Sequence, residues 1–113
     1  MKELRDIIKD FNNERDWNQF HSPKNLVMAL TVEVSELLEH FQWLTQEQSK
    51  DLSPAKKEKI GEEIGDILIY LVNLADKLDI DPIQAAQNKI EKNRKKYPVD
   101  KSKGKSLKYD EYE

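Results

Sequence analysis

Two stretches of the sequence decide the fold: residues 23–44, PKNLVMALTVEVSELLEHFQWL, and residues 54–79, PAKKEKIGEEIGDILIYLVNLADKLD. In both stretches apolar residues recur three and four positions apart, which is the spacing of one face of an α-helix. Each stretch also begins with a proline that directly follows a serine, and this pair is a strong signal for the start of a helix. The sequence therefore predicts two long amphipathic helices.

The residues on either side of this pair predict two further helices. Apolar periodicity indicates a helix over residues 2–15, and Asp81, followed by proline, begins another over residues 82–96. Residues 45–53 are polar and are expected to form a loop. No segment shows the alternation that is typical of a β-strand. We therefore predict an all-α fold, a four-helix bundle.

Length and composition predict one domain that associates with copies of itself. The chain has 113 residues, enough for a single domain, which we assign to residues 1–98. Residues 99–113 are polar and rich in lysine and are expected to form a mobile tail. Only 37% of the residues are apolar, below the usual value of about 45–50%, and the mean hydropathy is −0.86. Because such a chain has a thin core, we expect a homo-oligomer.

Composition also excludes several functional classes. The chain has no cysteine, which rules out disulfides, cysteine-zinc sites, iron–sulfur clusters and thiol nucleophiles. No stretch approaches the roughly 18–20 apolar residues of a membrane span, and no signal-peptide core is present. The net charge is −3, which argues against a nucleic-acid polymer as partner. We therefore expect a cytoplasmic protein with no membrane partner.

Four acidic residues lie in or beside the apolar stripes of the two long helices. On a helical wheel three leucines fall within about 40° of Glu33, and Glu36 lies about 60° to the other side. Glu63 and Asp66 take the corresponding places on the second helix. Since an unpaired buried carboxylate is costly, four converging acids call for a cation. An all-oxygen ligand set suits Mg²⁺, or Mn²⁺, better than Zn²⁺.

Two other interpretations of these acids stay open at this point. The acids can instead form salt bridges with lysines at a bundle or oligomer interface, which would suit a non-catalytic helical interaction or regulatory module. A di-iron bundle requires Glu-x-x-His on two helices. Neither His21 nor His40 follows a glutamate by three positions, which disfavours that metal centre.

The pair of motifs Glu33-x-x-Glu36 and Glu63-x-x-Asp66 resembles the ExxE and ExxD signature of the MazG-like, all-α nucleoside triphosphate pyrophosphohydrolases. The resemblance covers most of residues 4–109 and points to the dCTP pyrophosphatase branch of that family. The further stretches that carry it are RDWNQFH at 15–21, PKNL at 23–26, FQW at 41–43, DILIYL at 66–71, NRKKYP at 93–98 and KY at 108–109.

This resemblance implies a reaction, a site and an assembly. Family members cut a nucleoside triphosphate between the α and β phosphates, giving the monophosphate and pyrophosphate, in nucleotide-pool housecleaning. The branch also implies a homotetramer built as a dimer of dimers. By resemblance, the metal-binding and catalytic residues are Glu33, Glu36, Glu63 and Asp66, and the substrate-binding residues are Trp17, Trp43, Tyr70, Lys89 and Asn93.

The resemblance leaves the base of the preferred nucleotide open between two expectations. A deoxynucleoside triphosphate similar to dCTP is the first expectation, and dUTP or dUDP is the alternative, because related all-α enzymes share the metal motif. Vertebrate members of the branch carry a histidine against the base where this chain has Ile8. For His21 and His40 we expect a structural or solvent-facing role. Trp17 and Tyr70 also fit ordinary core positions.

Overall fold

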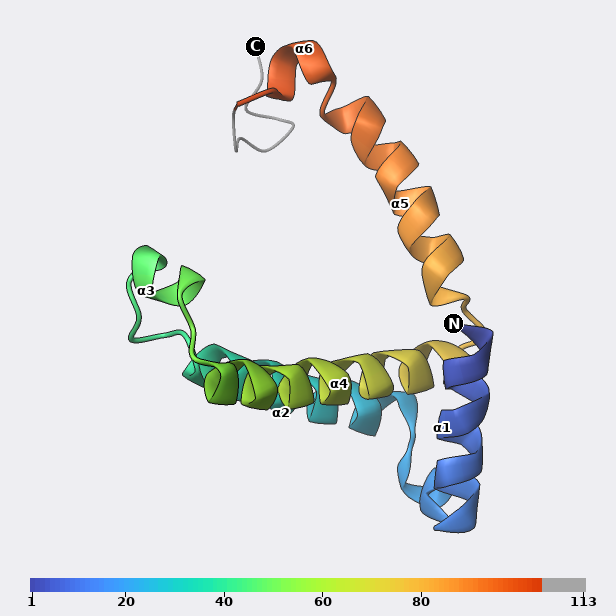
Figure 1. Ribbon diagram of the computed structural model, residues 1–113. Helices are drawn as coiled ribbons and strands as arrows, with labels where there is room; N and C mark the ends of the chain where they lie inside the picture. The colour runs from blue at the N-terminus through green and yellow to red at the C-terminus, as the bar shows by residue number, and fades with distance from the viewer. Residues whose placement is uncertain (105–113) are drawn as a thin grey trace. The chain divides into compact units, whose positions relative to one another are not determined.

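The computed structural model describes residues 1–104 and confirms the all-α fold, since no strand occurs in that part of the chain. The chain divides into two compact units, Met1–Ile80 and a second that begins at Asp81. No helix among the described residues is long and apolar enough to cross a membrane. The elements in order are α1 (Lys2–Glu14), the 3-10 helix η1 (Trp17–Phe20), α2 (Pro23–Glu39), α3 (Gln46–Lys50), α4 (Pro54–Lys77), α5 (Pro82–Lys96) and α6 (Val99–Ser102) (Figure 1).

The three helix starts predicted from a serine or aspartate followed by proline are confirmed. The Oγ atoms of Ser22 and Ser53 each accept a hydrogen bond from a backbone N–H three residues on, at 3.2 Å in both cases. Asp81 Oδ1 accepts from two N–H groups in the first turn of α5, at 2.9 and 3.1 Å. These bonds satisfy N–H groups that have no partner within the helix.

Helix α2 ends at Glu39, although periodicity predicted helix as far as Leu44. Beyond Glu39 the backbone tightens into turns, and the N–H of Leu44 donates to the carbonyl of Phe41, three residues back, at 2.9 Å. Histidine and the aromatic residues in this segment are weaker helix formers than the residues before them. Trp43 consequently stands outside the helix, with 86% of its surface exposed.

Two local hydrogen-bond motifs set boundaries that periodicity did not predict. Thr45 and Gln48 form a capping box, with bonds of 3.1 and 2.9 Å, and so begin the short helix α3 inside the predicted loop. Helix α4 ends at Lys77 rather than at Asp79. Asp79 takes a left-handed conformation, with φ of 55°, and the N–H of Ile80 then donates back to Ala75 at 2.8 Å.

The predicted tail can be compared with the structure only in part. Residues Val99–Ser102 form the short helix α6 within the second unit. The remainder of the predicted mobile tail, from residue 105 on, lies outside the described residues, as does the KY pair at 108–109. The domain boundary at residue 98 stays a prediction.

The apolar core of the first unit lies where α2 and α4 pack side by side, antiparallel, with α1 against α4 (Figure 1). Leu26 and Val72 are its most buried large side chains, at 1% and 2% exposed. Ile8, Ile60 and Ala75 complete the buried apolar set among the described residues. Many large apolar side chains of the same two helices remain exposed, namely Val27, Met28, Val32, Val34, Leu38, Ile64, Leu68, Ile69 and Leu71. The core is therefore as thin as the composition predicted.

We expect Leu26→Ala to lower the free energy of unfolding by about 2–5 kcal/mol, because it leaves a cavity at a fully buried position. Lys24→Ala, at an exposed position in the first turn of the same helix, should change it by less than about 0.5 kcal/mol. Urea unfolding at one protein concentration measures both. Equal effects of the two substitutions would contradict this assignment of the core.

Candidate active site

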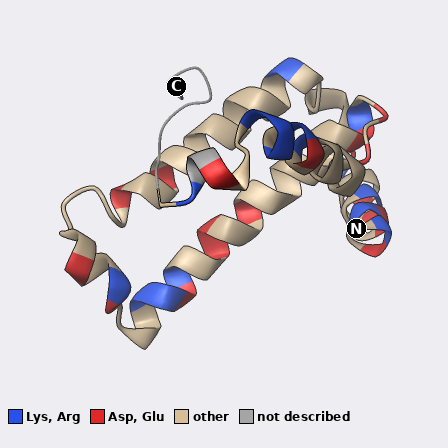
Figure 2. Cartoon of the chain, turned by 90° about the horizontal axis from the view of Figure 1, so that it is seen from above, with Lys and Arg blue, Asp and Glu red and all other residues tan. Residues whose placement is uncertain are grey.

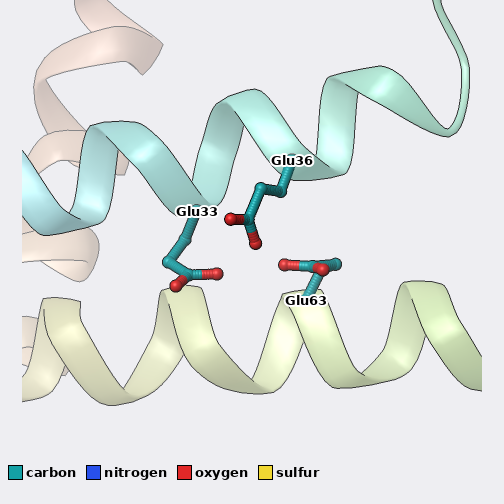
Figure 3. A group of neighbouring side chains, drawn as sticks. All are labelled: Glu33, Glu36 and Glu63. Atoms are coloured by element: carbon teal, nitrogen blue, oxygen red, sulfur yellow. The ribbon is translucent and has the colours of Figure 1, made fainter.

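Three of the four predicted acids meet between α2 and α4. Glu33 and Glu36 extend from α2 toward Glu63 on α4 (Figure 3). One carboxylate oxygen of each residue lies within 4.8 Å of the others, and all three side chains are partly buried. The spacing of three residues places Glu33 and Glu36 on one face of α2, as the helical wheel predicted. We call these three residues the carboxylate cluster.

The carboxylate cluster lacks the partners that buried acids need. Glu33 Oε2 and Glu63 Oε2 are buried and accept no hydrogen bond from the described residues. Burial, followed by the neighbouring carboxyls of Glu63 and Glu36, raises the pKa of Glu33 to about 7. Burial also raises the pKa of Glu63. Glu33 and Glu63 are therefore held in surroundings that disfavour their charged forms.

No lysine or arginine of the described residues forms an ion pair with the carboxylate cluster. In the part of the chain that the structure describes, none of its members takes part in an ion pair. Three lysines of α4 lie near its start and Lys77 lies at its end, while acidic residues lie along its middle (Figure 2). Within the described part of the single chain the acids form no salt bridge, and the alternative in which they pair with lysines across an oligomer interface stays a prediction.

The donor set of the carboxylate cluster fits a hard divalent cation. It offers only oxygen ligands, which Mg²⁺ and Mn²⁺ prefer, and no nitrogen or sulfur of the kind that favours zinc. The two buried oxygens without partners, on Glu33 and Glu63, come from different helices. A cation held between these two oxygens would relieve the repulsion among the carboxylates and give each oxygen a partner.

Asp66, the fourth predicted ligand, lies at the edge of this arrangement. It is one turn beyond Glu63 on α4, is exposed, and is not among the acids whose oxygens lie within 4.8 Å of one another. Its negative charge nevertheless contributes to the raised pKa of both Glu33 and Glu63. Asp66 also lines a neighbouring cavity, so it connects the carboxylate cluster to that cavity.

The cavity has a volume of about 330 Å³ and is lined by residues of α1, η1 and α4. Trp17 and Tyr70, two of the predicted substrate-binding residues, line it together with Phe11. The rings of Phe11 and Trp17 meet edge to face, with 5.4 Å between their centroids. The cavity is thus walled by aromatic and aliphatic side chains, which suits a flat ring as ligand.

Three polar residues of this cavity were not predicted as site residues: Asn12, His21 and Asn73. Asn73 Nδ2 donates to His21 Nδ1 at 3.1 Å, and burial, followed by the charge of Lys77, lowers the pKa of His21. The sequence did contain a signal for Asn12. It follows Ile8 by four positions, which places both residues on one face of α1.

The other predicted substrate-binding residues lie elsewhere. Trp43 is exposed and is not among the residues that line the cavity. Lys89 and Asn93 belong to α5, in the second unit of the chain. Their roles in binding substrate stay predictions.

Comparison with known proteins identifies the family. A sequence model of the MazG-like family matches residues 28–112. The chain belongs to the MazG-like family. A pyrophosphatase from Archaeoglobus fulgidus, known from a crystal structure, is 44% identical, with a TM-score of 0.82 over 87% of this MazG-like chain and 92% of that chain. The all-α fold inferred from the sequence is confirmed by this similarity.

Two curated relatives of the MazG-like chain carry the name dCTP pyrophosphatase 1. The protein from Bos taurus is 44% identical over 111 residues, and that from Homo sapiens is 41% identical over 113 residues. The alignments cover 96% and 98% of this chain, and the chain spans 66% of the length of each relative. The family resemblance and its dCTP pyrophosphatase branch are thereby confirmed.

The raised pKa of Glu33 predicts a pH-dependent stability of the metal-free MazG-like protein. Its folded-state pKa of about 7 exceeds the ordinary value of 4.5, so the folded protein holds this proton more tightly than the unfolded chain. The contribution of this proton to the free energy of unfolding is fully present below about pH 4.5 and is lost as the pH rises through about 7. We expect the melting temperature in EDTA to fall over this range, and Glu33→Gln to reduce the fall.

Thermal melts of both proteins across this pH range, with Glu58→Gln as an exposed control on α4, measure the effect. The control should follow the wild type. Mg²⁺ at about 100 times its Kd should stabilise the wild type by about 2.7 kcal/mol, and Glu33→Gln should lose this gain. Identical pH profiles and identical Mg²⁺ responses for wild type and Glu33→Gln would contradict the role of Glu33.

Proposed function

We propose that the chain is a Mg²⁺-dependent nucleoside triphosphate pyrophosphohydrolase, with Mn²⁺ as an alternative ion. It converts deoxynucleoside triphosphates, with dCTP-like substrates preferred, to the monophosphate and pyrophosphate in cytoplasmic nucleotide-pool housecleaning. The observation that carries this proposal is the carboxylate cluster, with its unpartnered buried oxygens, beside an aromatic cavity. The names of the two curated relatives support the same reaction.

The geometry suggests how the two halves of a nucleotide are accommodated. The triphosphate lies against Glu33, Glu36 and Glu63, where a bound Mg²⁺ supplies the positive charge that neutralises phosphate oxygens. The base enters the cavity beside Trp17 and Tyr70, since aromatic rings stack on any nucleobase. The family resemblance adds Asp66 as a fourth metal ligand and catalytic residue. It also adds Trp43, Lys89 and Asn93 as further contacts to base, phosphate and sugar.

The reaction adds one water across the α–β phosphoanhydride. The water oxygen forms a bond to phosphorus, the bridging P–O bond breaks, and pyrophosphate leaves. A proton of the water passes to a carboxylate. The acceptor is one of the four predicted catalytic acids, Glu33, Glu36, Glu63 and Asp66, or neighbouring Glu62 or Glu39. Phosphoanhydride cleavage otherwise needs positioning and charge stabilisation, which a preorganised cluster provides.

We expect purified protein with Mg²⁺ to release monophosphate and pyrophosphate from the common deoxynucleoside triphosphates and dUTP. Glu63→Gln should lower the rate by at least about 100-fold because it removes a cluster ligand, whereas the exposed control Glu58→Gln should not. Chromatography that separates the two products from diphosphate and phosphate provides the measurement. The panel includes dUDP and the ribonucleotides.

Two outcomes of this assay would count against the proposal. Hydrolysis of dUDP to monophosphate, without cleavage of triphosphates to pyrophosphate, would favour the dUDP alternative. No turnover of any nucleotide with Mg²⁺ or Mn²⁺ would favour the non-catalytic interaction module.

We further propose that the protein assembles as a homotetramer, a dimer of dimers. Val32, Met28 and Leu38 of α2 are 56%, 59% and 58% exposed in the single chain, and burial of such apolar surface is the main driving force for association. Light scattering after gel filtration should give four times the chain mass of 13.3 kDa. Val32→Asp should shift the protein toward smaller species, and Lys24→Asp should not. A wild-type monomer would refute the assembly.

A further inference from the structure

Asn12 differs from His21 and Asn73, which bond to each other in the same cavity, because its side chain has no partner among the described residues. The residue is 4% exposed, and its amide forms no hydrogen bond with the residues that the structure describes. Asn12 lies one turn beyond Ile8 on α1 and directly follows Phe11, and all three residues line the cavity. The amide atoms of Asn12 are not among the fully buried side-chain atoms without a partner, so they remain accessible from the cavity that the residue lines. A ligand in that cavity is expected to supply their hydrogen-bond partner.

The neighbouring pair of His21 and Asn73 shows the contrasting case. Asn73 is 5% exposed, and its Nδ2 donates to His21 Nδ1. The bond fixes the orientation of the Asn73 amide and leaves the ring proton of neutral His21 on Nε2. Burial and Lys77 lower the pKa of His21, which favours that neutral ring. This pair therefore presents one fixed hydrogen-bonding pattern, whereas the amide of Asn12 is free to turn.

A primary amide matches the edges of both kinds of pyrimidine. Its oxygen accepts and its nitrogen donates two hydrogen bonds. Cytosine offers an amino donor beside a ring-nitrogen acceptor, and uracil or thymine offers a carbonyl acceptor beside an N–H donor. Rotation of the amide by half a turn converts one complementary pattern into the other. Because no described residue holds the Asn12 amide, neither orientation is favoured before the ligand binds.

We infer that Asn12 binds the edge of the nucleobase in the cavity and accepts amino- and oxo-pyrimidines to within about tenfold of each other. The inference rests on the proposed function, in that a nucleotide base occupies the cavity. It makes Asn12 a specificity-determining residue, and any preference for dCTP over dUTP is correspondingly modest. A site that instead holds its polar groups in one orientation rejects the mismatched analogue far more strongly.

The test measures binding of deoxycytidine and deoxyuridine to metal-free protein by calorimetry. These nucleosides lack phosphates, so their binding depends on neither the cation nor hydrolysis. The wild type should bind both with dissociation constants that differ by less than about tenfold. Asn12→Leu should weaken the binding of both by roughly tenfold, the loss expected for an unmade hydrogen bond to a buried ring.

The matched control is Asn13→Leu, which makes the same change at an exposed position beside Asn12 on α1 and should leave both affinities unchanged. Melting without ligand gives an independent readout. Asn12→Leu should melt at or above the wild-type temperature, because the amide it replaces forms no hydrogen bond with the described residues and leucine adds apolar contacts. Asn12→Ala serves as a second variant if the leucine does not fit.

The outcomes separate this inference from the proposed reaction. Unchanged affinities in both Asn12 variants, a preference of more than about 100-fold for one nucleoside, or no binding of either would overturn it. Binding of both nucleosides that depends on Asn12, in a protein that hydrolyses no nucleotide, would uphold it and refute the proposed reaction. Hydrolysis of nucleotides by the wild type, with nucleoside affinities that both Asn12 variants leave unchanged, would do the reverse.

Discussion

The repulsion among three carboxylates held between two packed helices is the constraint on which the site depends. Glu33, Glu36 and Glu63 lie close together, two of their oxygens are buried without partners, and no described lysine or arginine pairs with them. A chain that needed only a stable bundle would place apolar residues at these positions. The pair α2 and α4 thus combines a structural interface with a cluster of charge that fits a divalent cation.

The cavity follows from the same helix pair because α4 contributes to both. Asp66 and Tyr70 lie one turn apart on α4, so one residue neighbours the carboxylates while the next lines the aromatic wall. Helix α1 packs against α4 and completes the cavity with Asn12 and Phe11. A rigid helix therefore sets the distance between the charged and the aromatic parts of the site, which a loop would set less exactly.

The thin core has a consequence for this arrangement. Leu26 and Val72 are buried almost completely, but long stretches of apolar surface on α2 and α4 stay exposed in the single chain. The helices that carry the carboxylates are thus held together by few buried side chains. Association with further copies would add the apolar burial that composition alone makes scarce.

The sequence by itself determined the helices, their capped starts and the acids in the apolar stripes, because periodicity and capping are local properties of the chain. It also determined the family, through two motifs on consecutive helices. Periodicity did not predict that α2 ends at Glu39 and leaves Trp43 exposed, because the weak helix formers that follow continue the apolar spacing of the helix. Only the tertiary structure decided that Asn12, His21 and Asn73 share one cavity, because α1, η1 and α4 meet only when the chain packs.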